Sequence, residues 1–374
     1  MPSRTAPGFT APGQSTARGL ASGAAKRGRL GRSLLVHGPR EAGAAAFVDD
    51  LLALLLCEDP DLGQRPCNGC RGCRDARARV HPDLVVGSPA TWRESRAGGE
   101  SIVAAARRWL MGAAGAPIVA DRRVILIEDA DAASEQAQNA LLKALEEPNP
   151  RQMFILTATD PGRLLPTIRS RCQTLRLGPV PRDELTGWLM DSEHLPADQA
   201  QLVAIISRGM AGAAQTYARN PDSLAWRRRV QGELLALLGR GRAARFAAAR
   251  ELVAEAAARA DAGNEPPATS VDDETAGRPA PATAQQRAGA LLVLDAWIDL
   301  ARDLVVVAAG RSPLASAGDL LDGLDAAGRR LSPAAAARSV RALERAREGV
   351  AANAAPRLAM SVAMLAWPTL EGGR

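Results

Sequence analysis

The amino-acid sequence predicts an α/β protein with a parallel sheet, followed by a mainly helical second half. The first observation is a pair of short apolar runs, 124–127 and 153–157, on either side of a helical segment at 134–147. Apolar runs of this length that flank a helix are typical of strands buried in a parallel sheet. The second observation is composition, because alanine is abundant and aromatic residues make up only 3%. This composition favours aliphatic, helix-rich cores.

Strands and helices alternate along the N-terminal region. The predicted helices lie at residues 15–25, 41–56, 102–111 and 134–147. The predicted strands lie at residues 33–36, 84–86, 124–127 and 153–157. Such alternation is typical of a doubly wound sheet with helices on both faces. Residues 1–12 show no periodic pattern and are expected to be disordered, and a polar loop is expected from residue 87 to about residue 100.

Length and charge limit the classes of function. The chain has 374 residues, enough for two or three domains. No run approaches the roughly 18 to 20 apolar residues of a membrane span, and residues 1–16 lack the apolar core of a secretion signal. We therefore expect a cytoplasmic protein with no membrane contact. The net charge of +6 is modest, so a basic surface near DNA stays open as a hypothesis.

Four of the five cysteines lie close together in the sequence. Cys57, Cys67, Cys70 and Cys73 form a C-x9-C-x2-C-x2-C array. Four thiolates at such spacing can close a tetrahedral Zn²⁺ shell with no open position, which makes a structural site. Scattered reduced thiols are the alternative, and disulfides are disfavoured in a reducing compartment. We expect one zinc ion per chain, whereas Cys172 is expected to be a small buried residue.

A loop with two glycines follows the first predicted strand. Gly38 and Gly43 have the spacing of the P-loop, G-x-x-x-x-G-K-[ST], in which the lysine and the hydroxyl hold phosphates and Mg²⁺. Ala44 and Ala45 occupy these two positions. Alanine supplies neither a cation nor a metal ligand, so the loop lacks the charge neutralisation that phosphoryl transfer requires. We predict a pseudo-ATPase that does not hydrolyse ATP; a weakly nucleotide-binding loop is the alternative.

Acidic residues follow or end two of the predicted elements. Glu128 and Asp129 leave the strand 124–127 at the end where open α/β sheets bind ligands. Glu146 and Glu147 end the helix that begins at residue 134. Negative charge there opposes the helix dipole and costs roughly 0.3 to 1 kcal/mol per group. An unfavourable charge at a helix end indicates a functional or interface role for these residues.

The amino-acid sequences of three segments closely resemble those of the clamp-loader branch of the AAA+ ATPases. These segments are 139–148, NALLKALEEP, 157–161, TATDP, and 170–172, SRC. The resemblance implies that Glu128 and Asp129 form a Walker B element in reversed order. It places Thr159 at the sensor 1 position and Gly212 where a sensor 2 arginine would lie. It also makes Arg171 the arginine finger that is offered to a neighbouring subunit.

The resemblance also implies three domains and a zinc module. An AAA+-like α/β domain would cover 1–178, with the zinc module at 57–73. A helical lid would cover 179–220, and a helical collar through which subunits form a ring would cover 221–374. Within the collar, residues 263–286 are rich in Pro, Ala, Thr and acidic residues and are expected to form a disordered loop.

This resemblance implies a non-hydrolysing subunit of the clamp loader of bacterial DNA polymerase III. The subunit would lie in a hetero-oligomeric ring beside a motor ATPase and a delta-type wrench subunit. It would donate Arg171 and support loading of the sliding clamp onto primed DNA. Two alternatives stay open. Micromolar Mg·ATP affinity with turnover would favour a motor subunit, and salt-sensitive DNA binding by the isolated chain would favour a zinc-ribbon DNA-binding protein.

Overall fold

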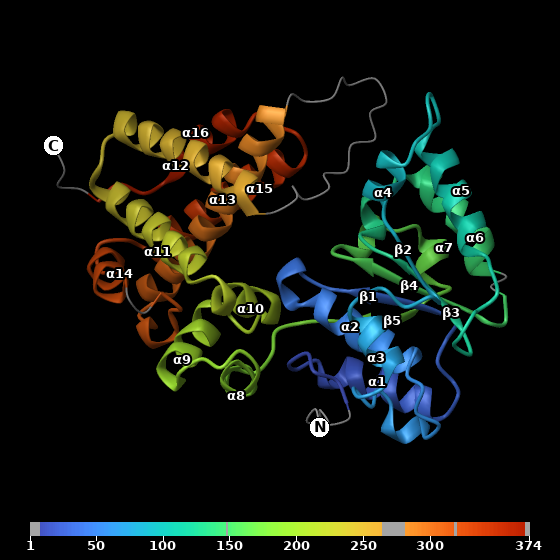
Figure 1. Cartoon of the computed structure of the whole chain (residues 1–374). Helices are drawn as coiled ribbons and strands as arrows, with labels where there is room; N and C mark the ends of the chain where they lie inside the picture. The colour runs from blue at the N-terminus through green and yellow to red at the C-terminus, as the bar shows by residue number, and fades with distance from the viewer. Residues whose placement is uncertain (1–7, 147–148, 264–280, 318–319, 371–374) are drawn as a thin grey trace. The chain divides into compact units, whose positions relative to one another are not determined.

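The computed structural model describes residues 8–146, 149–263, 281–317 and 320–370. The chain divides into two compact units, Met1–Arg219 and Asn220–Arg374 (Figure 1). The predicted further division of the first unit at residue 178 stays a prediction. Among the described residues, no helix combines the length and apolar character that a membrane crossing requires.

The first unit is built on a five-stranded sheet with the order β2-β3-β4-β1-β5, in which every neighbouring pair is parallel. The strands are β1 (Ser33–His37), β2 (Leu84–Gly87), β3 (Arg123–Ile127), β4 (Gln152–Ala158) and β5 (Gln173–Arg176). His37 pairs with Ala158, and Ile127 pairs with Leu156. The carboxyl ends of β1, β3 and β4 therefore meet at one edge of the sheet.

Helices cover both faces of this sheet (Figure 1). The helices of this region are α1 (Ser15–Lys26), α2 (Ala44–Leu55), α3 (Arg71–Arg77), α4 (Pro89–Glu94), α5 (Ile102–Ala113), α6 (Glu135–Glu146) and α7 (Pro166–Arg169). Short 3-10 turns are η1 (Arg40–Ala42), η2 (Leu62–Gln64), η3 (Ala130–Ala132) and η4 (Pro161–Arg163). The predicted parallel α/β core is confirmed.

Side chains alternate between the two faces along each strand, as the pleat requires. Leu34 and Val36 of β1 are buried with residues of α1 and α2. Leu35, between them, is buried with residues of α5 and α6. Strands that are apolar on both faces must be covered on both sides, which explains why the sequence shows continuous apolar runs rather than alternation.

Three elements of the first unit were not predicted. The predicted polar loop to residue 100 contains α4, which starts with a capping box between Ser88 and Thr91 and buries Trp92 completely. Helix α3 follows Cys70, whose sulfur accepts the N–H of Cys73. Strand β5 is short and carries only one buried side chain, Leu175, so it shows no apolar run.

The helices that follow the sheet, in the region predicted to be a lid, are α8 (Arg182–Ser192), α9 (Ala197–Ile206) and α10 (Ala211–Arg219). The second unit is helical, as expected. It contains α11 (Pro221–Ala236), α12 (Arg242–Gly263), α13 (Pro281–Ala308), α14 (Leu321–Gly328), α15 (Pro333–Ala351) and α16 (Pro356–Ala366), with turns η5 (Leu237–Gly239) and η6 (Ser312–Leu314). Its core includes the buried Trp297 and Trp367. Because α13 begins at Pro281, the C-terminal end of the predicted loop 263–286 is helical; residues 264–280 lie outside the described residues.

Candidate metal centre and degenerate nucleotide site

The four cysteines of the zinc module meet at one point. Cys57 follows α2, Cys67 and Cys70 lie in the next loop, and Cys73 lies on α3. Their sulfur atoms all lie within 4.8 Å of one another, and the sulfurs of Cys57 and Cys70 are 3.9 Å apart. Four Zn–S bonds of about 2.3 Å in a tetrahedron would place the sulfurs about 3.8 Å apart. The cluster can therefore hold one metal ion.

Backbone N–H groups point at the sulfurs, whereas burial disfavours the thiolate form of two of them. The N–H of Cys67 donates to the sulfur of Cys57 at 3.4 Å, and the N–H of Cys73 donates to the sulfur of Cys70 at 3.3 Å. Burial raises the pKa of Cys57 and of Cys73. Burial also acts to raise the pKa of Cys67, but hydrogen bonds from the backbone N–H groups of Gly69 and Cys70 lower this pKa to about 7. A bound cation would compensate the charge of the four thiolates, and its closed shell would make it structural.

The fifth cysteine is not part of this cluster. Cys172 is only 9% exposed and packs against the apolar core on the α5 and α6 side of the sheet. Burial raises its pKa to about 11, so the thiol stays protonated and unreactive near neutral pH. The prediction of a small buried residue is confirmed.

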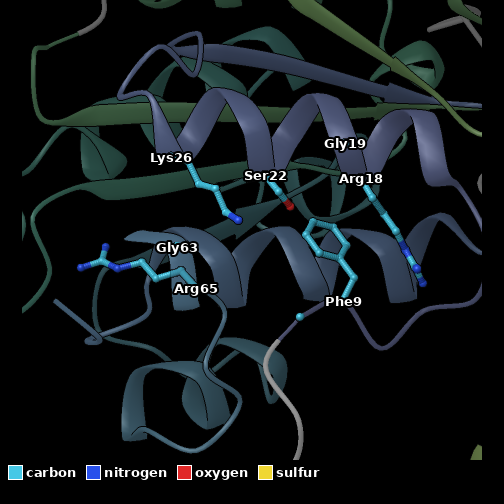
Figure 2. Close-up of a pocket in the computed structure, with 8 residues that line it drawn as sticks. Phe9, Arg18, Gly19, Ser22, Lys26, Gly63 and Arg65 are labelled. Carbon is cyan, nitrogen blue, oxygen red and sulfur yellow. The ribbon is translucent and has the colours of Figure 1, made fainter. Parts of the chain in front are cut away.

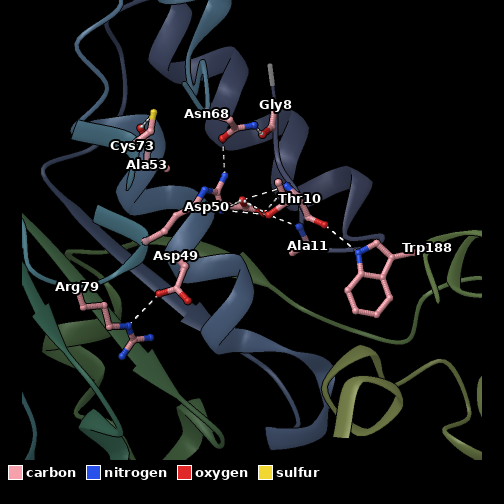
Figure 3. Close-up of polar contacts among 11 residues, drawn as sticks. Gly8, Thr10, Ala11, Asp49, Asp50, Ala53, Asn68, Cys73, Arg79 and Trp188 are labelled. Carbon is pink, nitrogen blue, oxygen red and sulfur yellow. Dashed lines mark hydrogen bonds and ion pairs between the residues drawn. The ribbon is translucent and has the colours of Figure 1, made fainter. Parts of the chain in front are cut away.

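A fully buried carboxylate, Asp50 on α2, organises the contacts around the zinc module (Figure 3). It accepts hydrogen bonds from the N–H groups of Thr10 and Ala11, at 2.9 and 2.7 Å to Oδ2. The Arg77 guanidinium of α3 forms an ion pair with it. A buried charge is tolerated when it is paired and its remaining lone pairs are satisfied, and Asp50 meets both conditions.

We call residues 8–14 the N-terminal strap. Its start binds the zinc module, because the N–H of Gly8 donates to the carbonyl of Pro66 at 2.9 Å and Asn68 donates to the carbonyl of Gly8 at 2.8 Å. Further along, the indole N–H of Trp188 in α8 donates to the carbonyl of Thr10 at 3.0 Å (Figure 3). The predicted disorder of residues 1–12 is wrong for residues 8–12, because buried acceptors hold their backbone; residues 1–7 lie outside the described residues.

Replacing Asp50 by asparagine is expected to loosen the strap. The change leaves the Arg77 guanidinium without its charge partner, and breaking a buried ion pair costs roughly 3 kcal/mol. Protection of the Thr10 and Ala11 amides against hydrogen exchange should fall by about 100-fold, since each 1.4 kcal/mol is a factor of ten. The matched control is Asp75→Asn, which removes a surface pair whose Arg71 is 79% exposed and should change little. Equal protection in the two variants would contradict the role of Asp50.

The predicted P-loop positions lie at the edge where the strands end. Gly38 follows β1 and approaches β5 so closely that a Cβ atom on it would lie 2.5 Å from the carbonyl oxygen of Leu177. Gly43 has a φ of +87°, a conformation that favours glycine, and α2 begins directly after it with Ala44 and Ala45. The turn between β1 and α2 thus contains a glycine with positive φ directly before the helix, and its assignment as a degenerate P-loop stays a prediction.

The lid backbone lies directly on this turn. A Cβ atom on Gly212, in the first turn of α10, would lie 3.0 Å from the carbonyl oxygen of Glu41 and 3.2 Å from the amide nitrogen of Gly43. A Cβ atom on Gly43 would lie 3.3 Å from Ala211 and from the amide nitrogen of Gly212. Gly212, the predicted sensor 2 position, thus packs against the backbone of Gly43 in the predicted P-loop.

The acidic strand end is engaged by an arginine. Arg79 donates to Glu128 at 2.7 Å and to Asp49 at 2.9 Å. Burial acts to lower the pKa of Arg79, but the charges of Asp49 and Glu128 outweigh it and raise the pKa above its ordinary value. Burial also raises the pKa of Asp49, against the effect of Arg79. Glu128 is therefore held by an internal cation.

The other two predicted residues of this edge are fixed through their backbones. Asp129 has a φ of +48°, and its N–H donates to the Thr157 hydroxyl at 3.0 Å. Thr159, at the sensor 1 position, is exposed, and its N–H donates to the buried Asp131 at 3.1 Å. Burial raises the pKa of Asp131.

Gly13 and Gln14, directly before α1, find hydrogen-bond partners within the first unit. The side-chain amide of Gln14 donates to the carbonyl of Gly178 at 2.7 Å and accepts the Gly178 N–H at 3.0 Å. Val180 packs so closely on Gly13 that a Cβ atom there would lie 2.4 Å from the valine methyl group. Gly13 also donates its N–H to Glu184 of α8 at 2.9 Å.

Arg171 stands apart from this edge. It follows α7, forms an ion pair with Glu146 at 2.7 Å, and donates to the carbonyl of Thr167 at 2.9 Å. Both charged side chains are partly exposed, 36% for Arg171 and 44% for Glu146. Glu146, whose negative charge at the C-terminal end of α6 opposes the helix dipole, thus has a cationic partner. Glu147 lies outside the described residues.

The sequence interpretation missed the residues that join these sites. Asp50 left one signal, because it lies at helical spacing from the buried Phe47 and Leu54 and is therefore a charge on the apolar face of α2. Arg77 and Arg79 left none, since arginine is common throughout the chain.

A five-stranded parallel sheet with helices on both faces, a turn with Gly38 and Gly43 after β1 and three short helices after β5 define an α/β core of the AAA+ type. Residues 13–181 match the family model described as "DNA polymerase III, delta subunit". Subunit delta' of DNA polymerase III from Escherichia coli is 32% identical over 50% of this chain and 54% of its own length. The N-terminal region is thus similar to the delta-prime subunits, in agreement with the resemblance seen in the sequence.

Two further similarities were found. Subunit tau of DNA polymerase III from Salmonella typhimurium is 30% identical over 50% of this chain and 28% of its own length. The RuvB Holliday junction branch migration motor of Thermotoga maritima aligns with 57% of this chain and 63% of its own, at 19% identity and a TM-score of 0.38. The chain spans about half the length of the delta-prime relatives that it matches.

Proposed function

We propose that this chain is a non-hydrolysing, delta-prime-type subunit of a DNA polymerase III clamp loader. It would support ATP-dependent loading of the sliding clamp onto primed DNA as a fixed member of a hetero-oligomeric ring. The observation that carries the proposal is the contact between Gly43 and Gly212, which puts lid backbone against the turn that would hold phosphates. A subunit closed in this way can serve as a scaffold but not as a motor.

Two further observations support the absence of hydrolysis. Ala44 and Ala45 provide neither the cation nor the metal ligand of a P-loop, and such positioned charges carry most of the rate of phosphoryl transfer. Glu128, which would orient water or metal, is held by Arg79. The Gly43–Gly212 contact, the two alanines and the Glu128–Arg79 pair lie at one edge of the sheet. Each of the three alone would weaken an ATPase severely.

We assign the arginine-finger role to Arg171. Its guanidinium is partly exposed, and the residue follows the short helix α7. A guanidinium delivered to a neighbour's γ-phosphate stabilises the charge that develops there. Glu146 would hold Arg171 in place until that neighbour is bound.

We assign ring formation to the second unit. Helix α16 exposes Leu358, Val362 and Leu365, which are 67%, 57% and 57% accessible. Their spacing of four and three residues places them on one face of the helix. An apolar helix face of this kind suits packing against a neighbouring subunit. The proposed partners are the motor ATPase and the delta-type subunit.

Calorimetric titration of the isolated chain with Mg·ATP tests the proposal. We expect no turnover and no binding tighter than about 1 mM. Restoring the motif by Ala44→Lys with Ala45→Thr should not change this result, because Gly212 and the Glu128–Arg79 pair are still in place. The wild-type chain is the matched control. Micromolar binding by the restored variant would show that the lid contact does not close the loop.

The motor subunit and the zinc-ribbon DNA-binding protein predict different results. A motor would bind micromolar Mg·ATP and turn it over without any change of sequence. A duplex-DNA reader typically makes six to ten phosphate contacts, so its affinity would fall steeply with salt. The similarity to subunit tau keeps the motor as the second candidate, since both share this α/β core.

A further inference from the structure

A groove open to solvent lies between α1, the N-terminal strap and the zinc module (Figure 2). Its volume is about 380 Å³. Small-ligand sites cover roughly 300 to 1,000 Å³, so the groove admits one or two nucleotides and is too small for a duplex. All three walls belong to the first unit.

The charge of the groove is positive. Arg18, Ser22 and Lys26 are spaced by four residues along α1 and face the groove together (Figure 2). A rise of 1.5 Å per residue separates the two cations by about 12 Å along the helix. Arg65 lines the groove from the zinc module, and no acidic residue lines it among the described residues. Cations that line a concave surface concentrate anions there.

Two details indicate what the groove would bind. The Phe9 ring lies between Arg18 and Lys26, with the Arg18 guanidinium carbon 6.0 Å from the ring centroid (Figure 2). Arg18 lines the groove, and arginine forms charge-assisted, often bidentate hydrogen bonds with phosphate oxygens.

We propose that this groove binds the phosphates of a single nucleic-acid strand. Arg18, Lys26 and Arg65 contact the phosphates, and Phe9 provides an apolar surface beside a base or sugar. A cationic groove with an aromatic side chain is the common plan of sites that bind single strands without reading sequence. The inference does not rest on the proposed function, because the groove is complete in the isolated chain.

Fluorescence anisotropy of the full chain with a labelled oligothymidylate tests the proposal. Three phosphate contacts should give a slope of about −2 for the logarithm of affinity against the logarithm of salt, at about 0.7 per contact. The triple variant Arg18→Gln, Lys26→Gln, Arg65→Gln should lose at least about tenfold in affinity at low salt and bring the slope close to zero. A steep fall of duplex-DNA affinity with salt would instead favour the zinc-ribbon DNA-binding protein.

A control removes the same charge elsewhere. Arg107→Gln, Arg151→Gln, Arg182→Gln changes three exposed arginines of the first unit and should leave the slope near −2. Equal losses in the two triple variants, or none in either, would overturn the proposal. If the groove variant does not fold, Ser22→Glu replaces it and must also weaken binding. Thymidine monophosphate and inorganic phosphate should compete only at much higher concentration; competition at equal phosphate concentration would make the groove a small-anion site and overturn the strand assignment.

Discussion

Replacing Arg171 with alanine is expected to abolish most ATP turnover at the site that receives this side chain in a reconstituted clamp loader. An arginine finger supplied in trans contributes roughly 10³- to 10⁵-fold to the rate, so turnover at that site should fall by at least about 10³-fold. The isolated chain should fold and assemble normally, because Arg171 is partly exposed and its ion pair with Glu146 lies at the surface. The measurement is the DNA-stimulated ATPase of the complex, with assembly checked by size-exclusion chromatography.

Two variants separate the finger from a general loss of charge. Arg169→Ala removes an exposed arginine two positions earlier and should leave turnover unchanged. Glu146→Gln removes the partner of Arg171 within its own chain and should leave turnover unchanged or raise it. An Arg171→Ala complex that assembles and retains full ATPase activity would remove the finger assignment.

Removing the metal is expected to unfold the zinc module while the sheet stays folded. Structural zinc contributes roughly 10 to 16 kcal/mol of folding free energy in zinc-finger peptides, far more than a module with so few buried apolar residues can supply. Chelation, or Cys57→Ser with Cys73→Ser, should abolish hydrogen-exchange protection at 67–77. The amides of Thr10 and Ala11 should lose protection too, because Arg77 no longer orients Asp50.

Metal analysis of the purified chain provides the control for this prediction. It should give one zinc per wild-type chain and the same value for Cys172→Ser, since Cys172 lies in a different core. The strands β1, β3 and β4 should keep their protection in every variant. A chain that contains no metal, or a module whose protection survives chelation, would refute the structural zinc site.

The sequence predicted the sheet well where strands are apolar on both faces. The runs 33–36, 124–127 and 153–157 lie in β1, β3 and β4, the central strands of the sheet. Strand β5 was not predicted, because an edge strand with one buried side chain has no apolar run. Helix α4 has its own start signal, Ser88 before Pro89, but a six-residue helix is too short to show periodicity.

The candidate sites were predictable to the extent that spacing alone encodes them. The four cysteines are close in sequence, and two short intervals already bring sulfurs together. The ion pairs Arg77–Asp50, Arg79–Glu128 and Arg171–Glu146 join residues that are 25 or more positions apart. Such pairs depend on how elements pack, and neither charge nor periodicity in one segment identifies the partner in another. The role of Arg171 and the loss of hydrolysis stay predictions.

The close contact between Gly43 and Gly212 also bears on how this chain could evolve. A side chain at position 212 would bring a Cβ atom to 3.0 Å from the Glu41 carbonyl oxygen, so the neighbouring backbone would have to shift by a few tenths of an ångström. Any side chain at position 212 therefore requires a small adjustment of the first turn of α10 or of the turn before α2, so substitutions in these two segments, which are distant in the sequence, are coupled.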